Sequence, residues 1–250
     1  YVSDDKKVGA VVEVNAETDF VAKNEEFKAF VADVAEIVTA ENPADVEALL
    51  EVKYKKKKKT VREVLTDKIA TIGENMNIRR FVLVDGVTST YIHGGGMAGV
   101  IVKFEADEAV AAKPEFAEFA KNICLQIAAG TPPTYVCREE VPASVLESEK
   151  AIIKAQLAND PKMANKPEKV LDGIVMGKLG KFYEANCLVD MAYVKEDDMT
   201  VAQYVAKTAK ELGGNITIAS FCRFEKGEGI EKKEENFADE VAAQIAGAAK

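Results

Sequence analysis

The sequence predicts an α+β protein made of two similar subdomains, each an antiparallel sheet flanked by helices. Three observations predict this fold: an internal repeat, alternating strand-like and helix-like hydrophobic patterns, and an insertion in the second copy of the repeat. We place the first subdomain at 1–86 and the second at 87–226, with a coiled-coil-like helical hairpin at about 144–184. A C-terminal helical module at 227–250 completes the chain.

The internal repeat is a series of matches that occur in the same order in both halves. At an offset of 90 residues Gly9 falls on Gly99, and at an offset of 140 Thr60 falls on Thr200. Further matched pairs are Val12 with Val102, Phe27 with Phe116, Phe30 with Phe119, Asn75 with Asn215 and Phe81 with Phe221. Between these blocks the offset grows from 89 to 140, so the second copy holds 51 extra residues between Ala120 and Thr200.

Helix start and stop signals order the elements of the first copy. Asn24 is a predicted cap, Pro43 is expected to open a short helix, and Thr60 begins a capping-box pattern that Gly73 ends. The turn signal Asp85-Gly86 is expected to join two strands. In order, we expect strands Tyr1–Val2 and Val8–Val14, a helix with Phe27, Phe30, Val31, Val34 and Ile37 on one side, a short helix with Val46, Leu49 and Leu50, a helix with Val64, Leu65, Ile69 and Ile72, and strands Met76–Val84 and Val87–His93.

The second copy repeats this order with the insertion. We expect strand Gly99–Phe104, helix Pro114–Ala129, helix Thr200–Leu212, strand Asn215–Phe224 and a last helix Asn236–Ala249. The insertion reads as helices Ser144–Leu157 and Pro167–Glu184 around the turn Asn159-Asp160-Pro161, with Val170, Leu171, Ile174, Val175 and Leu179 on one stripe. Because the first copy lacks these helices, we expect a protruding antiparallel hairpin rather than two helices packed on the sheet.

Composition and charge exclude several classes of protein. The chain is 48% hydrophobic and 30% charged, which excludes a disordered chain, and no stretch of 18 apolar residues exists to span a membrane. The net charge of −9 argues against general nucleic-acid binding. Cys124, Cys137, Cys187 and Cys222 form no CxxC pair, so we expect reduced thiols and no zinc cluster. Because the sequence begins at Tyr1 rather than Met, we expect a fragment or a processed product.

Six of the seven residues Lys53–Lys59, here called the lysine run, are lysines. The run has three interpretations: a phosphate or RNA site, a surface that steers an acidic partner, or a solvated loop, which we favour. Only Tyr54 could serve as an aromatic platform for bases, so no specific nucleic acid is expected.

No catalytic, metal or cofactor site is expected. Gly94-Gly95-Gly96, here called the glycine turn, lacks the Lys-Ser/Thr of a P-loop and lies between two strand patterns, which favours a hairpin turn. His93 is the one histidine, and paired carboxylates such as Asp197-Asp198 are typical of solvated turns in an acidic protein. The chain is therefore not expected to be an enzyme.

The segment that joins the first strand to the first long helix, Glu17–Asn24, carries the most information. Phe20 directly follows Asp19, and the matching segment Glu105–Ala111 of the second copy has no aromatic residue. A core residue should occur in both copies, whereas a functional side chain need occur in only one. We therefore interpret Asp19 and Phe20 as a carboxylate and an apolar wedge on an exposed loop that enters another protein.

Three motifs give the chain a resemblance to the elongation factor Ts family. They are Glu17–Asn24 (Glu-Thr-Asp-Phe-Val-Ala-Lys-Asn), Ile72–Arg80 (Ile-Gly-Glu-Asn-Met-Asn-Ile-Arg-Arg) and the segment that begins at Phe224 (Phe-Glu-Lys-Gly-Glu-Gly-Ile-Glu-Lys). The resemblance covers the whole chain, but not the small N-terminal helical domain with which the family begins. Two stretches depart from the family pattern: His93–Gly99 lacks an Arg-Ile pair, and Gln126 stands where the family has histidine.

The resemblance implies a guanine-nucleotide exchange factor that binds elongation factor Tu, GDP-bound and nucleotide-free, and promotes GDP release in translation elongation. It implies no cofactor, and a bacterial cytoplasm or an organelle matrix as the location. The implied partner-binding residues are Thr18, Asp19, Phe20, Val21, Asn24, His93, Gly95 and Gly99. The alternatives are an RNA- or ribosome-associated module that uses the lysine run and, in another class, a metabolic enzyme; dimerisation through the hairpin stays open.

Overall fold

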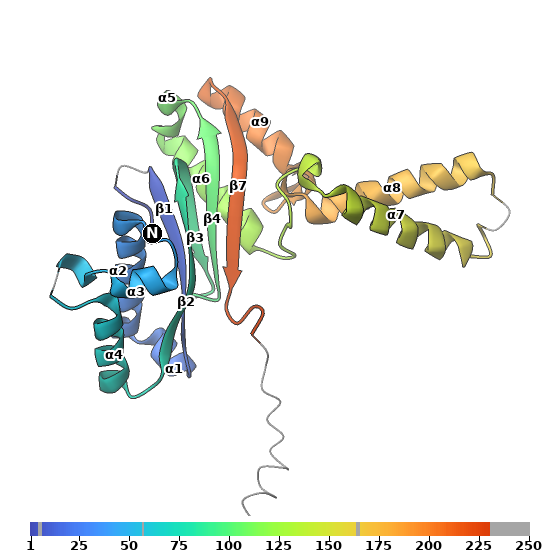
Figure 1. Cartoon of the computed structure of the whole chain (residues 1–250). Helices are drawn as coiled ribbons and strands as arrows, with labels where there is room; N and C mark the ends of the chain where they lie inside the picture. Colours follow the sequence, from blue (N-terminus) through green and yellow to red (C-terminus); the bar gives the residue numbers. More distant parts are fainter. Residues whose placement is uncertain (5–6, 57, 164–165, 231–250) are drawn as a thin grey trace, which may run out of the picture.

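The computed structural model describes residues 1–4, 7–56, 58–163 and 166–230 (Figure 1). Two antiparallel sheets stack face to face, and helices cover the outer face of each sheet. This arrangement confirms the α+β prediction. The expected helix Asn236–Ala249 lies outside the described residues. Among the described residues, no helix is both long and apolar enough to cross a membrane.

The first sheet pairs β1 with β2, and helices cover its outer face. β1 spans Val8–Ala16 and β2 spans Met76–Asp85. The helices are α1 (Asp19–Lys23), α2 (Glu25–Glu41), α3 (Val46–Glu51) and α4 (Val61–Ile72), and a 3-10 turn occupies Tyr54–Lys56. Phe30, Val34, Leu49 and Val61 are buried between this sheet and its helices. The expected strand at Tyr1–Val2 is reduced to one bridge, from Val2 to Gly9.

The second sheet has the order β3–β4–β7 and carries its own helices on the opposite side of the sandwich (Figure 1). Its strands are β3 (Val87–His93), β4 (Ala98–Ala106) and β7 (Ile216–Glu225), and its helices are α5 (Glu108–Ala111), α6 (Pro114–Ala128) and α9 (Val201–Leu212). A small ladder of β5 (Ala192–Tyr193) and β6 (Glu196–Thr200) precedes α9. Two 3-10 turns, Arg138–Glu140 and Leu188–Asp190, flank the inserted hairpin.

Two glycines let the sheets approach closely. A Cβ atom on Gly9 would lie 2.8 Å from Thr88 Oγ1, and one on Gly99 would lie 2.9 Å from Val11 Cγ1. Contacts this short do not occur for real Cβ atoms, so larger residues would push the sheets apart. The two glycines are partners in the sequence repeat, which explains why both copies hold glycine there.

The strand registers of the two halves coincide under the repeat offsets. Val8 pairs with Asp85 in the first sheet, and Ala98 pairs with Glu225 in the second. A register shift follows Glu13 in β1, and one follows the equivalent Lys103 in β4. This agreement supports the duplication, while the boundaries at residues 86 and 226 stay predictions.

The caps of the helices follow the sequence signals, with one exception. The Asn24 side chain caps α2, Thr60 and Thr200 form capping boxes, and Gly73 ends α4 in the left-handed region. The prediction that Pro43 opens the short helix is wrong: Asp45 caps α3 and accepts a hydrogen bond from Ala48 N. A carboxylate that accepts a backbone N–H stabilises a helix start more directly than a proline at its first position.

The turn at Asp85-Gly86 joins the two sheets, because β2 pairs with β1 and β3 pairs with β4. Gly86 adopts φ +104° there, a conformation that L side chains rarely take.

The insertion forms the antiparallel hairpin of α7 (Ala143–Ala158) and α8 (Glu168–Asn186), which projects away from the sandwich (Figure 1). Ile153, Leu157, Val175 and Leu179 form a separate small core between the two helices. Val170 was expected on the same stripe, but it is 43% exposed. Leu171 and Ile174 of the same stripe do pack against this small core.

The four cysteines are free thiols. Burial raises the pKa of the Cys124 thiol to about 12, so this sulfur stays protonated and packs as an apolar group.

Candidate partner-binding site

Residues 18–24, here called the tip, form a helical turn where the sequence suggested a loop. Thr18 caps α1 by accepting a hydrogen bond from Val21 N at 3.4 Å, and its own hydroxyl donates to Glu74 Oε1 at 2.7 Å. At the other end Asn24 Oδ1 accepts from Glu26 N at 2.7 Å and so begins α2. The tip is therefore fixed at both ends by side-chain caps, which hold α1 in one orientation.

Phe20 points its ring into solvent from this rigid turn. The residue is 81% exposed, whereas Phe27 on the next helix is 6% exposed. Val21, beside Phe20, is buried in a cluster with Phe27 and Met76, so its contribution is to hold the tip in place. In the second half α5 forms the equivalent turn, with Val110 buried and Ala109 where Phe20 stands. The fold thus does not require an aromatic ring at this position.

Asp19 is an exposed carboxylate beside that ring. Its side chain is 62% exposed and forms an ion pair with Lys23 at 2.6 Å. The hydrogen bond from Lys23 is the main reason that the pKa of Asp19 lies below its usual value, and the charge of Lys226 lowers it further. Asp19 therefore carries a full negative charge at neutral pH.

The glycine turn connects β3 to β4, as predicted. Gly94, Gly95 and Gly96 all have positive φ, and the amides of Gly96 and Met97 donate to the carbonyl of His93 at 3.2 and 3.0 Å. His93 is exposed at the end of β3, with its ring 5.9 Å from that of Tyr91. Gly95 has open space around it, whereas Gly99 is buried between the sheets and acts through packing.

Two exposed apolar side chains at the glycine turn were not predicted from the sequence. Ile92 is 59% exposed and Met97 is 48% exposed. The sequence signal for them was their position, because Ile92 and Met97 lie on either side of a predicted hairpin turn. Together with His93 they give this end of β3 and β4 a partly apolar surface.

The tip and the glycine turn lie at the same end of the sandwich (Figure 1). Gly9 of β1 faces Ile101 of β4, and Val11 faces Gly99, so the two strands run in opposite directions across the sheet interface. The last residues of β1 therefore lie at the same end as the first residues of β4. The turn after β7 lies at this end as well, because Lys226 N donates a hydrogen bond to Met97 O of the glycine turn region at 2.9 Å.

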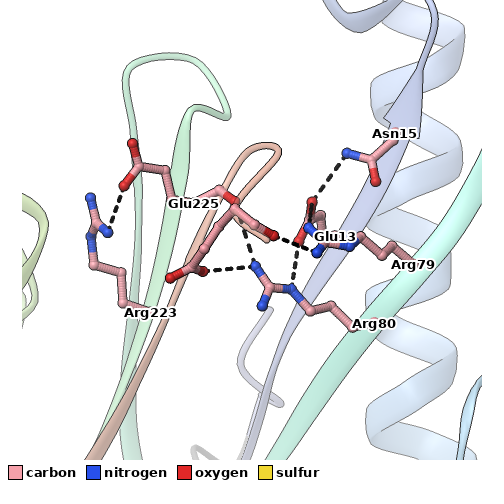
Figure 2. A network of polar contacts seen from close by, with 7 residues as sticks. Glu13, Asn15, Arg79, Arg80, Arg223 and Glu225 are labelled. Carbon is pink, nitrogen blue, oxygen red and sulfur yellow. Dashed lines mark hydrogen bonds and ion pairs between the residues drawn. The ribbon is translucent and has the colours of Figure 1, made fainter. Parts of the chain in front are cut away.

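A network of polar contacts, seen in Figure 2, holds this end together. Glu13 is 7% exposed and accepts hydrogen bonds from Arg79 at 2.9 Å, from Arg80 at 2.6 Å and from Asn15 at 3.2 Å. Arg80 continues to Glu228 at 3.0 Å, and its guanidinium lies 4.1 Å from the centre of the Phe224 ring. The network thus ties the first sheet to β7 and to the turn that follows it.

Glu13 is charged within this network. Burial opposes its ionisation, but the hydrogen bonds from Arg79, Arg80 and Asn15 outweigh burial, so the pKa of Glu13 lies below its usual value. In the sequence, Arg79 and Arg80 stood out only as part of a motif. The pairing of Arg79 with Glu13, 66 positions away, was not predictable from that motif.

Two further sequence features are explained by contacts inside the chain. Gln126 is buried, donates to Ala192 O at 3.1 Å and accepts from Val194 N at 2.7 Å, so it holds the β5–β6 ladder against α6. The preferred interpretation of the lysine run as a solvated loop agrees with the exposure of Lys53, Lys55, Lys58 and Lys59, two of which also form ion pairs. Lys55 pairs with Asp33 at 2.5 Å and with Glu36 at 2.8 Å, and Lys59 pairs with Asp67.

Comparison with known proteins identifies the class of this fold. The sequence model of the family described as Elongation factor TS matches residues 17–228. Elongation factor Ts of Clostridium perfringens (strain 13 / Type A) is 48% identical over 245 residues, which is 97% of this chain and 78% of the relative. Elongation factor Ts of Clostridium botulinum (strain Eklund 17B / Type B) is 45% identical over 98% of this chain and 79% of the relative.

Elongation factor Ts of Clostridium kluyveri (strain NBRC 12016) is 44% identical over 99% of this chain and 79% of the relative. The chain is thus a translation elongation factor. Within that class it belongs to the elongation factor Ts family.

Proposed function

We propose that this protein binds elongation factor Tu and promotes the release of its GDP. Membership of the elongation factor Ts family supports the proposal. The observation that carries it is the exposed ring of Phe20 on a capped helical turn whose counterpart in the second half holds Ala109. An exposed aromatic ring that the fold does not need is typical of a binding residue.

The proposed role of the tip is to disturb the nucleotide site of the partner. Phe20 enters an apolar space on elongation factor Tu, and burial of its ring stabilises the complex. Asp19 then brings a negative charge toward the site where the partner holds magnesium and phosphate, which weakens the hold on those groups. The caps made by Thr18 and Asn24 support this role, because a rigid turn loses little conformational freedom on docking.

The glycine turn is the second proposed contact with the partner. His93 and Gly95 face solvent at the same end of the sandwich as the tip, and Ile92 and Met97 add apolar area. Contacts at two separated points fix the orientation of the partner relative to the tip.

Exchange itself requires no bond chemistry from this chain. A factor that binds the nucleotide-free partner more tightly than the GDP-bound partner lowers the affinity for GDP by the same ratio. The proposed location is a bacterial cytoplasm, with an organelle matrix as the alternative. Dimerisation through the hairpin stays a prediction.

The alternative function, RNA binding through the lysine run, loses support from the ion pairs of Lys55 and Lys59, because phosphates would compete with Asp33, Glu36 and Asp67 for these two ammonium groups.

Release of a fluorescent GDP analogue from elongation factor Tu tests the proposal. Catalytic amounts of this chain should accelerate the release, and a chain with Phe20→Ala should do so more slowly. An unchanged release rate with the wild-type chain would reject the proposed function.

A further inference from the structure

Two grooves occupy equivalent places on the two halves of the molecule. The first groove, of about 430 Å³, lies between α2 and α4 and includes Glu26 and Lys68 in its lining. The second groove, of about 560 Å³, lies between α6 and α9 and includes Glu115 and Thr208. The repeat offsets of 89 and 140 relate Glu26 to Glu115 and Lys68 to Thr208.

Lysines of the chain itself form part of the lining of the first groove. Lys68 forms an ion pair with Glu26 from inside the groove, and Lys59 of the lysine run pairs with Asp67 at its edge. Lys55 reaches Asp33 at 2.5 Å from the same loop. In the first half, the carboxylates in and beside the groove are therefore paired with lysines of the chain.

The loop beside the second groove has the opposite charge. It occupies the position of the lysine run, since Val201 N donates to Met191 O just as Val61 N donates to Val52 O, both at 2.9 Å. Lys195 Nζ donates to Asn122 Oδ1 at 2.7 Å, and the repeat offsets relate this pair to Lys55 and Asp33. The residues that follow are Glu196, Asp197 and Asp198, where the first half has lysines.

Three carboxylates line the second groove and outnumber its one lysine, Lys113. Glu115, Glu118 and Glu211 are exposed in its lining, and none of them forms an ion pair within the part of the chain that the structure describes. Lys113 also lines the groove, but its ammonium group donates to Leu212 O at 2.7 Å, at the end of α9.

The base of the second groove offers apolar and polar contacts together. The rings of Phe119 and Tyr204 lie 5.3 Å apart and form part of its lining. Thr208 is 7% exposed, and its hydroxyl has no hydrogen-bond partner among the described residues. An aromatic base suits the aliphatic part of a lysine or arginine side chain, and acidic walls suit its charged end.

We propose that the second groove binds a lysine- or arginine-bearing segment of a partner protein, whose cationic side chain pairs with Glu115 as Lys68 pairs with Glu26 in the first half. The aliphatic part of the cationic side chain contacts Tyr204, and its charged end lies between Glu115, Glu118 and Glu211. Nucleic acid does not fit this site, because its phosphates would meet three carboxylates and only one lysine. The surface belongs to the helical side of the second sheet, so it is separate from the tip and from the proposed release of GDP.

A labelled peptide with the sequence of residues 52–60 is the probe for this site, measured by fluorescence anisotropy with the whole chain at low salt. The wild-type chain should bind it, and the triple variant Glu115→Gln, Glu118→Gln, Glu211→Gln should bind at least tenfold more weakly. The matched control replaces Glu105, Glu147 and Glu168 by glutamine. These exposed residues lie outside the groove, and the control changes the net charge by the same amount.

A second variant tests the groove by blocking it. Thr208→Lys places an ammonium group where Lys68 stands in the first groove, so it should pair with Glu115 and block the peptide. The proposal is overturned if the wild-type chain fails to bind the peptide below millimolar concentration. It is also overturned if the control and groove variants weaken binding equally, or if Thr208→Lys binds as tightly as the wild type.

Discussion

Replacing Phe20 by alanine separates binding from folding in this protein. The ring is 81% exposed, so the folded chain buries about a fifth of it. Full burial of a phenylalanine side chain stabilises by about 1.5–3 kcal/mol, so the substitution should lower the free energy of unfolding by only about 0.3–0.6 kcal/mol. At roughly 2–4 °C per kcal/mol for a chain of this size, the melting temperature should move by about 1–2 °C.

The same ring should matter far more in the complex. If docking buries the exposed part, the loss is about 1.2–2.4 kcal/mol, which corresponds to about eight- to sixtyfold slower stimulated release of GDP. The assay follows a fluorescent GDP analogue leaving elongation factor Tu at sub-saturating concentrations of each variant. Asp19→Ala should give a smaller loss than Phe20→Ala, because its charge acts at a distance.

Phe27→Ala is the matched control. Phe27 is 6% exposed, so its truncation should cost about 3–5 kcal/mol and lower the melting temperature by about 6–20 °C. A Phe20→Ala chain that melts like Phe27→Ala would show that Phe20 belongs to the core. A stable Phe20→Ala chain with normal exchange would refute the proposed role of the tip.

Three further changes test other parts of the structure. Glu13→Gln should lower the free energy of unfolding at pH 7 by about 1–3 kcal/mol, since it removes the buried carboxylate that Arg79 and Arg80 share. The pKa of Glu13 in the folded chain lies below its usual value of 4.5. The difference in unfolding free energy between wild type and variant, measured with urea, should therefore be complete above pH 4.5 and shrink as the pH falls through the folded pKa. A constant difference down to about pH 2 would contradict the charge of Glu13. Replacing residues 146–184 by a short Gly-Ser linker should leave a cooperative thermal transition, because the hairpin has its own small core; a broad, non-cooperative melt would show that the sandwich depends on it. Changing Lys55–Lys59 to glutamine should alter the association rate with elongation factor Tu and its salt dependence more than the lifetime of the complex, measured by stopped flow, and loss of exchange at saturating protein would oppose this.

The sequence predicted those features of the fold that depend on local patterns and on the repeat. The capping residues Asn24, Thr60 and Gly73 act through groups within four positions, so their roles were visible without a structure. The matching of Gly9 with Gly99 predicted two related halves, and the strand registers agree with it. What the repeat did not predict is that the two sheets stack face to face, because stacking depends on contacts between the halves.

The candidate site was predictable in part. The comparison of Phe20 with the second copy indicated an exposed ring, and the structure agrees, but the helical turn that carries it escaped because it is only five residues long. Ion pairs between distant segments were also missed. The ion pairs of the lysine run were not predictable, because Asp33, Glu36 and Asp67 are brought to it only by the packing of α2 and α4.

Reciprocal binding of GDP and this chain to elongation factor Tu tests the central claim most directly. The affinity of the chain for elongation factor Tu should be measured by calorimetry with and without saturating GDP, and the affinity of elongation factor Tu for GDP with and without the chain. GDP and this chain should each lower the affinity of elongation factor Tu for the other by the same factor, and we expect this factor to be more than about tenfold. Equal affinity of the chain for the GDP-bound and nucleotide-free partner would contradict it, because a ligand without such a preference cannot drive release.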